Sequence, residues 1–535
     1  MFDQFLVRTP LFSLDFFNGL FDAERIDDEK LREVLTTDVV REAIYVGSPQ
    51  LHSEIDRWLE GRVTSPKRVR KFKVSVCKYL ARMSTRSTPF GLFAGFALGS
   101  FGKTSEVRLG LVQENRRHTR LDMNYLFALC HQVSSQEGLQ SQLHYYPNSS
   151  IYTMGHQYRY VEYRYKKTRR THHMVGIERS PYLEKILGKA RQGATLNALA
   201  NSIVEPDIPF EDARYFVDEL VKCQLLVPEL EPRITGEEFE NEFIQRLSGF
   251  SKNGVAVAEK MASVLTAVKE DISRIEASGL GLSPEHYEQI GEKLQTLDTA
   301  FEKKHLLQTD LVKVQTRATL SKRVGYSALR ALEVLNRLTS YRGRTNLLAF
   351  KQAFTNRYDD REVPLAEALD PEMGLGYPVG VDKSEFNPLI DDLRLPSTNN
   401  VRELRWSPVH RYLLEKYNRE VILGKKKEIE IQADELDQFP LNWNDLPPTI
   451  TAVISILRNR SDEHPRELMH MDYAGGASAS YLMGRFCHAD EQVHDFVREI
   501  IATEDELESE AITAEIVHLP EARTGNLPEA QFQTI

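Results

Sequence analysis

The chain has 535 residues, of which 41 % are hydrophobic, so it is long enough for about three domains of roughly 150 residues each. It carries 68 Lys and Arg against 78 Asp and Glu, and its four cysteines form no CxxC pair, which is typical of a reducing cytosol. No stretch approaches roughly 18 uninterrupted apolar residues and the N-terminus lacks a signal peptide. We therefore expect a cytoplasmic protein without a membrane span.

The first elements mix strand and helix. Residues 2–8 alternate and end near Pro10, as a strand would. Ser48 precedes a segment with Leu51, Ile55 and Leu59 at helical spacing, which predicts a helix capped by the serine. Residues 91–166 have a β-rich composition, so residues 1–149 are expected to form a β-rich N-terminal body.

The most basic segment of the chain runs from Lys67 to Arg86 and contains no acidic residue. Lys78, Arg82 and Arg86 are spaced four apart, so a helix over residues 74–84 would align them in one cationic stripe. Pro89 ends such a helix, and residues 90–101 then read as a buried strand. A cationic stripe beside a buried strand predicts an anion site; the alternative is a solvated basic helix face.

The charge of the chain is unevenly distributed. Residues 61–173 hold 20 Lys and Arg against 5 Asp and Glu, net +15, whereas the whole chain has a net charge of −10. Such asymmetry indicates a surface that binds a polyanion, and arginine, which predominates here, suits bidentate phosphate contacts. Nucleic acid is favoured over a membrane because no basic helix with an aromatic face accompanies the segment.

Residues 150–235 have the pattern of a winged-helix module. Tyrosines alternate with basic residues over 156–170, which predicts a hairpin strand, and three capped helices and a short strand follow over 180–228. The third helix carries four acidic residues against two basic ones, so it would repel a phosphate backbone. This favours a peptide, added as an extra strand, over duplex nucleic acid as the partner of the module.

The remainder alternates between helix and strand. Residues 236–310 predict a helical arm, with a strand around Asp310 at its end, and residues 311–535 predict an α/β part in which 421–431 reads as a strand. The expected fold class is α+β: a β-rich N-terminal body, a winged-helix insert, a helical arm and an α/β C-terminal part.

Five stretches carry a resemblance to a known family. Residues 82–95, Arg-Met-Ser-Thr-Arg-Ser-Thr-Pro-Phe-Gly-Leu-Phe-Ala-Gly, resemble the signature of the lantibiotic dehydratases, in their N-terminal glutamylating domain. Residues 6–10, 362–372, 476–486 and 518–526 resemble further motifs of that family, in the same order. The resemblance covers residues 6 to 526.

The resemblance implies an activity. Members of the family take glutamate from glutamyl-tRNA and esterify it to Ser or Thr side chains of a precursor peptide, and a separate elimination domain then expels the glutamate. The winged-helix module then corresponds to the family's recognition element, which binds the leader segment of the precursor peptide. Glutamyl-tRNA is a co-substrate, and neither a cofactor nor a metal is expected, since His172 and His173 lack metal-ligand spacing.

The resemblance also implies site residues. Arg82 and Arg86 match the family's two signature arginines, which would hold the tRNA ester and donate to the oxyanion. The other catalytic candidates are Asp122, Asp310 and Arg523, and the candidates for binding tRNA or substrate are Arg8, Lys78, Arg159, Lys166, Lys167, Arg169 and Arg170.

Each of these assignments has a structural alternative. Asp122 would equally serve as the N-cap of a helix over 123–130, and Arg8 would anchor a strand. Asp310 would pair with an arginine inside the fold, and Arg523 would organise a turn. The cluster at 166–170 would only solvate the tip of a hairpin.

The sequence departs from the family at its end, which lies nine residues after Asn526. We expect an elimination-domain protein or a missing C-terminal part as a partner, besides tRNA and the leader of the precursor peptide, and a homodimer is left open. Two other functions compete with glutamylation. One is a ligase that appends an amino acid from tRNA to a peptide C-terminus, and the other is a scaffold that binds the peptide but not tRNA.

Overall fold

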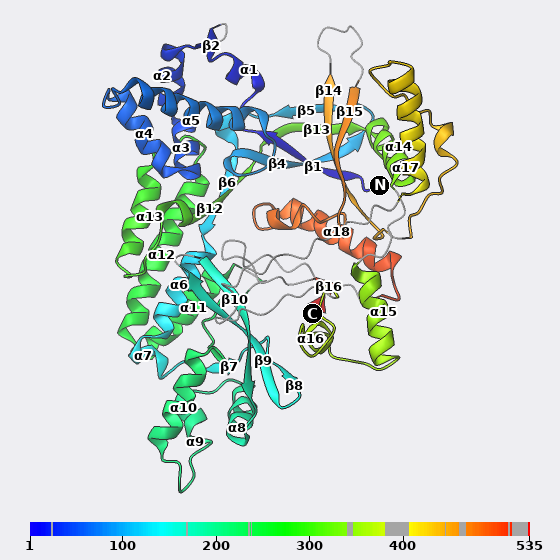
Figure 1. The fold of residues 1–535 in the computed structure, drawn as a ribbon. Coiled ribbons are helices and arrows are strands. Elements are labelled where there is room, and N and C mark those ends of the chain that lie inside the picture. The colour runs from blue at the N-terminus through cyan, green and yellow to red at the C-terminus, as the bar shows by residue number, and fades with distance from the viewer. Residues whose placement is uncertain are drawn as a thin grey trace. The chain divides into compact units, whose positions relative to one another are not determined.

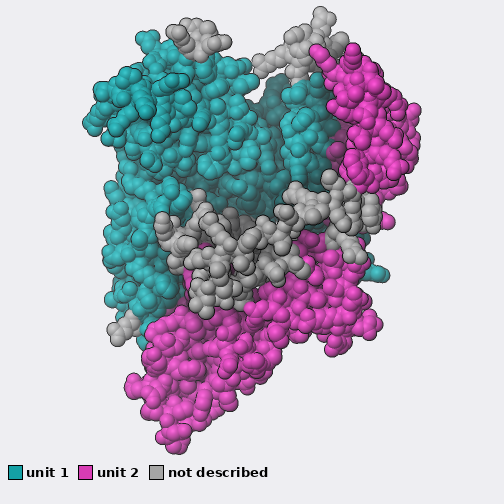
Figure 2. Space-filling model, viewed as in Figure 1, with its two compact units in different colours: residues 1–142, 230–326, 448–535 teal, residues 143–229, 327–447 magenta. Residues whose placement is uncertain are grey.

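The computed structural model describes residues 1–22, 25–166, 169–233, 236, 238–339, 346–379, 406–444, 446–458, 467–511, 514–515 and 533–534. Its internal contacts divide the chain into two units (Figure 2). Unit 1 comprises residues 1–142, 230–326 and 448–535, and unit 2 comprises residues 143–229 and 327–447. Both helices and strands are abundant, as the predicted α+β class requires. The sequence predicts four consecutive domains, namely an N-terminal body, a winged-helix insert, a helical arm and a C-terminal part. This division stays a prediction.

Unit 1 is organised by a six-stranded sheet whose longest strand is β4 (Gly91–Gly102). β1 (Gln4–Pro10) pairs antiparallel along β4, and β12 (Leu307–Val312) and β13 (Gln315–Ser321) pair parallel with its first and last parts. β6 (Arg116–Leu121) and β5 (Glu106–Leu109) complete the order β5-β13-β4-β12-β6. The strand expected over 90–101 is therefore confirmed, and most of it is buried.

Helices pack on one face of this sheet (Figure 1). They are α1 (Leu14–Asn18), α2 (Asp28–Thr36), α3 (Asp38–Gly47), α4 (Pro49–Leu59) and α5 (Pro66–Thr85). Ser48 caps α4 by accepting from the Leu51 N–H at 3.3 Å, as predicted. α5 buries Phe72, Val76 and Leu80 at helical spacing against Phe93 and Leu92 of β4, in one apolar core. Because residues 28–85 are mainly helical, the N-terminal part is less β-rich than expected.

The other face of the sheet packs on α18 (Glu491–Leu507) and the short helix η5 (Gly484–Phe486). Phe96 of β4 and Val312 of β12 join Phe486 and Val493 in this second core. Successive side chains of a strand point to opposite faces, so Leu311 belongs to the first core and Val312 to the second. Asp310, two residues before Val312, therefore lies on the α18 face.

The arm expected over 236–310 is helical. It consists of α11 (Phe239–Lys252), α12 (Ala256–Ala277) and α13 (Glu285–Gln295), which pack in succession. The helices α6 (Met123–Ser134) and α7 (Glu137–Gln140) and a hairpin of β14 (Thr451–Arg458) and β15 (Glu467–Gly475) also belong to unit 1. Small pairs form between β2 (Phe21–Asp22) and β3 (Arg25–Ile26), and between β16 (Ala514–Glu515) and β17 (Gln533–Thr534).

Unit 2 begins with strands and three helices, in the order that the sequence predicted. β8 (Tyr152–Met154), β9 (Gln157–Lys166) and β10 (Arg169–Glu178) form one sheet, and β7 (Tyr145–Pro147) pairs with β11 (Leu226–Pro228). Three helices lie between β10 and β11 in the chain: α8 (Pro181–Ala190), α9 (Leu196–Asn201) and α10 (Phe210–Lys222). Ser180 and Thr195 cap the first two helices, as expected.

The described residues of the second half of unit 2 form helices joined by turns and irregular segments. They include the part of α14 (Lys322–Leu338) from Ser327 onward, α15 (Asn346–Tyr358), α16 (Leu365–Leu369) and α17 (Pro408–Tyr417). The strand predicted over 421–431 is wrong. α17 runs on into the π-helical turn η3 (Asn418–Leu423), and Lys425 then adopts a φ of +52°, which a strand does not accommodate.

A membrane-spanning helix does not occur in the part of the chain that the structure describes, because no helix there is both long and apolar enough.

Candidate functional site

The cationic stripe lies at the C-terminal end of α5. Lys78 and Arg82 are one turn apart on this helix, and Arg86 follows its last residue, with its N–H bonded to the Arg82 carbonyl at 3.3 Å. The side chains of Lys78 and Arg86 are exposed. Within the described residues none of the three forms an ion pair, so their positive charges are available to an anion.

Arg82 is held in place by an aromatic ring rather than by a carboxylate. Its guanidinium lies over the ring of Phe90, 4.3 Å from the centroid. Its Nε is buried and has no hydrogen-bond partner among the described residues. A cation–π contact fixes the guanidinium plane without neutralising its charge, which suits a group that must meet an anionic ligand.

A second set of polar groups lies on the α18 face of the sheet. Arg485, in η5, donates to Asp310 Oδ1 at 2.8 Å. Asp310 is paired in register with Gly91 at the start of β4 and with His118 of β6. Gly91 directly follows Phe90, and the Arg82 guanidinium lies over the Phe90 ring. Asp310 and Arg82 are therefore both near the beginning of β4.

Sequence reasoning missed Arg485. The signal is present in the sequence, because residues 476–486 resemble a family motif and Arg485 is the only charged residue of that motif. Long-range pairing with Asp310 depends on how the sheet and η5 meet, and the motif alone does not show that.

Arg8 and Arg485 both lie beside the aromatic ring of Phe486. Arg8 lies on β1 opposite Phe96, donates to the Leu482 carbonyl at 2.8 Å, and sits 5.6 Å from the centroid of Phe486, while Arg485 lies 4.8 Å from it. Burial, and then the neighbouring charge of Arg485, lower the pKa of Arg8. Two guanidiniums are thus held close together, an arrangement that an anion between them would stabilise.

Further charged groups surround Asp310. Burial lowers the pKa of Arg120 on β6, although the nearby carboxylate of Asp310 opposes this. His118 contacts Glu238 and Glu276, each at 3.1 Å. Burial disfavours charge on this imidazole, but its hydrogen bonds to the two carboxylates outweigh burial and raise its pKa to about 9. His118 is therefore a cation at neutral pH.

The structure places Asp122 at the N-cap of α6. Its carboxylate accepts from the Asn124 N–H at 3.0 Å, and its own N–H bonds to the Leu306 carbonyl at 2.8 Å. The side chain is fully buried. The capping alternative is therefore realised, and a catalytic role of Asp122 stays a prediction.

Arg159 is used inside unit 2. It is 6 % exposed and pairs with Asp370 at 2.9 Å and with Glu372, and Tyr152 also donates to Asp370, at 2.6 Å. The loop after α16 is thereby bound to β8 and β9. The contact between Arg159 and tRNA stays a prediction, and in the fold this guanidinium is paired with two carboxylates.

The remaining candidates are residues whose side chains the structure does not describe. Arg523 and Lys167 lie outside the described residues. Lys166, Arg169 and Arg170 lie in strands β9 and β10, but the positions of their side chains are not among those described. The described part of the chain contains no group of three or more His, Cys, Asp or Glu side chains arranged to hold a metal ion.

The described candidate groups of unit 1 are therefore the unpaired cations at the end of α5, on one face of the sheet, and Asp310 with its neighbouring charged groups, on the α18 face. This set can hold an anionic ester or phosphate, donate hydrogen bonds to a developing oxyanion, and orient an ammonium group through Asp310.

Comparison with known proteins identifies relatives of the chain. Residues 36–530 match the model of the family described as lantibiotic dehydratase, N terminus. The subtilin biosynthesis protein SpaB of Bacillus subtilis is 22 % identical over 98 % of this chain and 49 % of its own length. The nisin biosynthesis protein NisB of Lactococcus lactis subsp. lactis is 23 % identical, over 90 % and 46 %. The epidermin biosynthesis protein EpiB of Staphylococcus epidermidis is 24 % identical, over 70 % and 37 %.

Two solved structures share the fold. The tRNA-dependent lantibiotic dehydratase MibB from Microbispora sp. 107891 superposes with a TM-score of 0.68, at 22 % identity, over 89 % of this chain and 44 % of its own. The glutamylation domain of TbtB, from thiomuracin biosynthesis, superposes with a TM-score of 0.51, at 16 % identity, over 92 % and 58 %. This chain spans half or less of the length of the three curated relatives. With 495 of its residues inside the family match, the chain belongs to the lantibiotic dehydratase family and corresponds to the N-terminal part of its members.

Proposed function

We propose that this chain transfers glutamate from glutamyl-tRNA to Ser and Thr side chains of a ribosomally made precursor peptide. The observation that carries the proposal is the arrangement of Arg82, Asp310 and Arg485 near the start of β4, within a fold shared with a tRNA-dependent dehydratase and a glutamylation domain. The family supplies the reaction, and the unneutralised cations of α5 supply a surface that suits the tRNA 3′ end.

The proposed step is an acyl transfer. The peptide hydroxyl oxygen attacks the ester carbonyl of glutamyl-tRNA, the bond to the 3′-terminal ribose oxygen breaks, and the hydroxyl proton ends on that ribose oxygen. The tRNA ester is already activated, so positioning and oxyanion stabilisation matter more than a strong base.

We assign roles to the side chains of the site on this basis. Lys78 and Arg86, which are exposed, hold the phosphate backbone near the 3′ end. Arg82, held over Phe90, donates to the oxyanion. Asp310, oriented by Arg485, receives the ammonium group of the glutamyl residue. Arg523 is proposed as a further cation of the site, on the family motif alone.

Unit 2 is proposed to hold the leader of the precursor peptide. The order α8, α9, α10 and β11 after a β-hairpin supports a winged-helix module. In the sheet order β10-β9-β8, the outer strands have edges to which an extended peptide can add. The acidic residues of α10, some of them paired with Arg214 and Lys222, disfavour nucleic acid there.

Alanine variants of α5 test the proposal. Arg82→Ala is expected to lower the rate of glutamyl transfer by about 100-fold or more, the cost of losing one oxyanion donor, with leader affinity unchanged. Lys73→Ala is the matched control. It removes one cation from the same helix, but Lys73 lies toward the opposite side and pairs with Asp28, so transfer should persist.

Two readouts separate failure of the site assignment from failure of the function. If Arg82→Ala and Lys73→Ala lose transfer equally, the assignment of Arg82 is wrong. If the unsubstituted chain binds peptide but not tRNA, the scaffold is the better account.

A further inference from the structure

Residues 476–486, which supply Arg485 to the proposed site, have little regular secondary structure. Apart from the short helix η5 they form bends, turns and irregular backbone. Gly475 and Gly476 have φ angles of +140° and +101°, so the chain leaves β15 through a conformation that other residues rarely adopt. An irregular segment lacks the repeated backbone hydrogen bonds of a helix or strand, so its position depends on contacts with neighbouring elements.

Glu504 of α18 provides such a contact. The residue is 5 % exposed. Its Oε1 accepts hydrogen bonds from the Ser478 hydroxyl at 2.8 Å, from the Ala479 N–H at 3.3 Å and from the Thr449 hydroxyl. Within the described part of the chain no cation forms an ion pair with this carboxylate. Three donors therefore converge on one buried oxygen, which needs them because a buried carboxylate is costly without hydrogen bonds.

The chain before β14 joins the same contact. The Ala479 N–H donates to Thr449 Oγ1 at 2.9 Å, and the Thr451 hydroxyl donates to the Ala479 carbonyl at 2.8 Å. Thr449 thus links Ala479 to Glu504. The carboxylate of Glu504 is therefore the acceptor at which α18, the beginning of the β14–β15 hairpin and the segment 476–486 meet.

Backbone turns carry this restraint along the segment to Arg485. The Met483 N–H donates to the Ser480 carbonyl at 2.8 Å, and the Phe486 N–H donates to the Met483 carbonyl at 2.9 Å. Phe486 is buried against Phe96, with ring centroids 4.3 Å apart. The Arg485 side chain is half exposed, so burial does not fix its guanidinium. The segment is held downstream by an aromatic contact and upstream by the acceptor on α18.

We propose that Glu504 is a positioning residue for the glutamyl transfer. By holding Ser478 and Ala479, it fixes the upstream end of the segment that keeps Arg485 against Asp310, and Asp310 receives the ammonium group of the glutamyl residue. Glu504 itself touches neither substrate nor the reacting atoms. The inference rests on the proposed function and adds to it a residue outside the family motifs.

Single-turnover transfer from radiolabelled glutamyl-tRNA tests the proposal. Glu504→Leu keeps a similar side-chain volume but offers no acceptor. The rate at saturating tRNA is expected to fall by about tenfold to 100-fold, because small misplacements at a site are this costly. The affinity for tRNA should not change, since the cations of α5 hold it. Glu499→Leu is the matched control, because this carboxylate lies on the same helix but is exposed.

A conservative variant and a second site support the test. Glu504→Gln retains an acceptor oxygen at the same position and is expected to restore most of the rate. Ser478→Ala removes one donor of the segment without altering α18, and should lower the rate several-fold even if Glu504→Leu does not fold.

A double-mutant cycle separates positioning from a purely structural role. If Glu504 acts through Arg485, then Glu504→Leu, or Ser478→Ala in its place, should lower the rate by less than about twofold in an Arg485→Ala background. A full further loss in that background would overturn the proposal, as would equal rates for Glu504→Leu and Glu499→Leu. An unsubstituted chain that transfers no glutamate would instead contradict the proposed function, and the role of Glu504 with it.

Discussion

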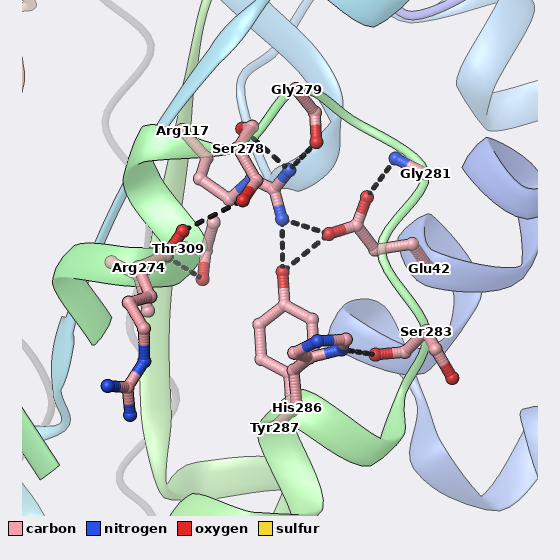
Figure 3. A network of polar contacts seen from close by, with 11 residues as sticks. Glu42, Arg117, Arg274, Ser278, Gly279, Gly281, Ser283, His286, Tyr287 and Thr309 are labelled. Carbon is pink, nitrogen blue, oxygen red and sulfur yellow. Dashed lines mark hydrogen bonds and ion pairs between the residues drawn. The ribbon is translucent and has the colours of Figure 1, made fainter. Parts of the chain in front are cut away.

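Substitutions in the buried ion pair of Glu42 and Arg117 (Figure 3) should lower the free energy of unfolding of unit 1 more than most other substitutions. Both side chains are 0 % exposed, and Arg117 also donates to Tyr287 Oη at 2.9 Å and to the Ser278 carbonyl at 3.2 Å. Arg117→Met leaves the Glu42 carboxylate buried, with only the Tyr287 hydroxyl and the Gly281 N–H as donors. Removing one partner of a buried pair costs about 3–5 kcal/mol, which is a large part of the 5–15 kcal/mol that stabilises a typical domain.

The double variant separates the pair from its surroundings. Glu42→Leu should cost a similar amount, because it leaves the guanidinium without a counter-charge. With both changes together no buried charge remains, so the combined loss should fall short of the sum by at least about 2 kcal/mol.

The assay is urea unfolding followed by tryptophan fluorescence. The chain has three tryptophans, of which Trp58 lies in the core of unit 1, while Trp406 and Trp443 lie in unit 2 and are exposed. In a background where the latter two are replaced by Phe, Trp58 reports unit 1 alone. A loss below about 1 kcal/mol for Arg117→Met, or strict additivity of the two changes, would refute the reasoning.

Three further outcomes follow from the structure. Lys313 is 5 % exposed and burial lowers its pKa to about 8, so Lys313→Met should raise the thermal midpoint at pH 7. This gain should shrink between about pH 8, where the folded protein's lysine loses its proton, and pH 10.5, where the unfolded chain's lysine does. Asp122→Ala should cost about 1–2 kcal/mol in urea unfolding through loss of the α6 cap, whereas Asp122→Asn should cost little, since asparagine caps equally well. Gly95→Ala should destabilise unit 1 in the same assay, because the added methyl would overlap the Leu311 carbonyl oxygen across the sheet.

Local patterns predicted the elements around the site well. The helix that carries Lys78 and Arg82, its end before Pro89 and the buried strand after it follow from charge spacing, proline chemistry and an apolar run, all of which act over a few residues. The helices that begin after Ser180 and Thr195 were likewise readable from their caps.

Contacts between distant segments were not readable. Arg485 meets Asp310 across 175 positions of the chain, and Arg117 is buried only because β6 turns alternate side chains toward α3 and α13. Arg159 was read as part of a basic surface, because nothing near it in the sequence announces its carboxylate partners at Asp370 and Glu372. Charge composition describes a segment as a whole and does not show which of its cations the fold neutralises.

Salt dependence tests whether the basic surface meets tRNA. Each neutralised phosphate releases counterions, so tRNA binding should weaken steeply as salt rises, and the slope should decrease by about one unit per lost contact in Lys78→Ala and Arg86→Ala. Filter binding at several salt concentrations measures the slope. A flat dependence for the unsubstituted chain would remove tRNA from the mechanism.

The most direct test of the proposed function is to incubate the chain with tRNA charged with radiolabelled glutamate and with the precursor peptide encoded beside it. The account predicts that the label moves to Ser and Thr side chains of the peptide and that mild base releases it as expected for an ester. It also predicts that Arg82→Ala slows the transfer by about 100-fold or more. A peptide that stays unlabelled although the chain binds it would contradict the account, and a base-stable label at the peptide C-terminus would favour the ligase.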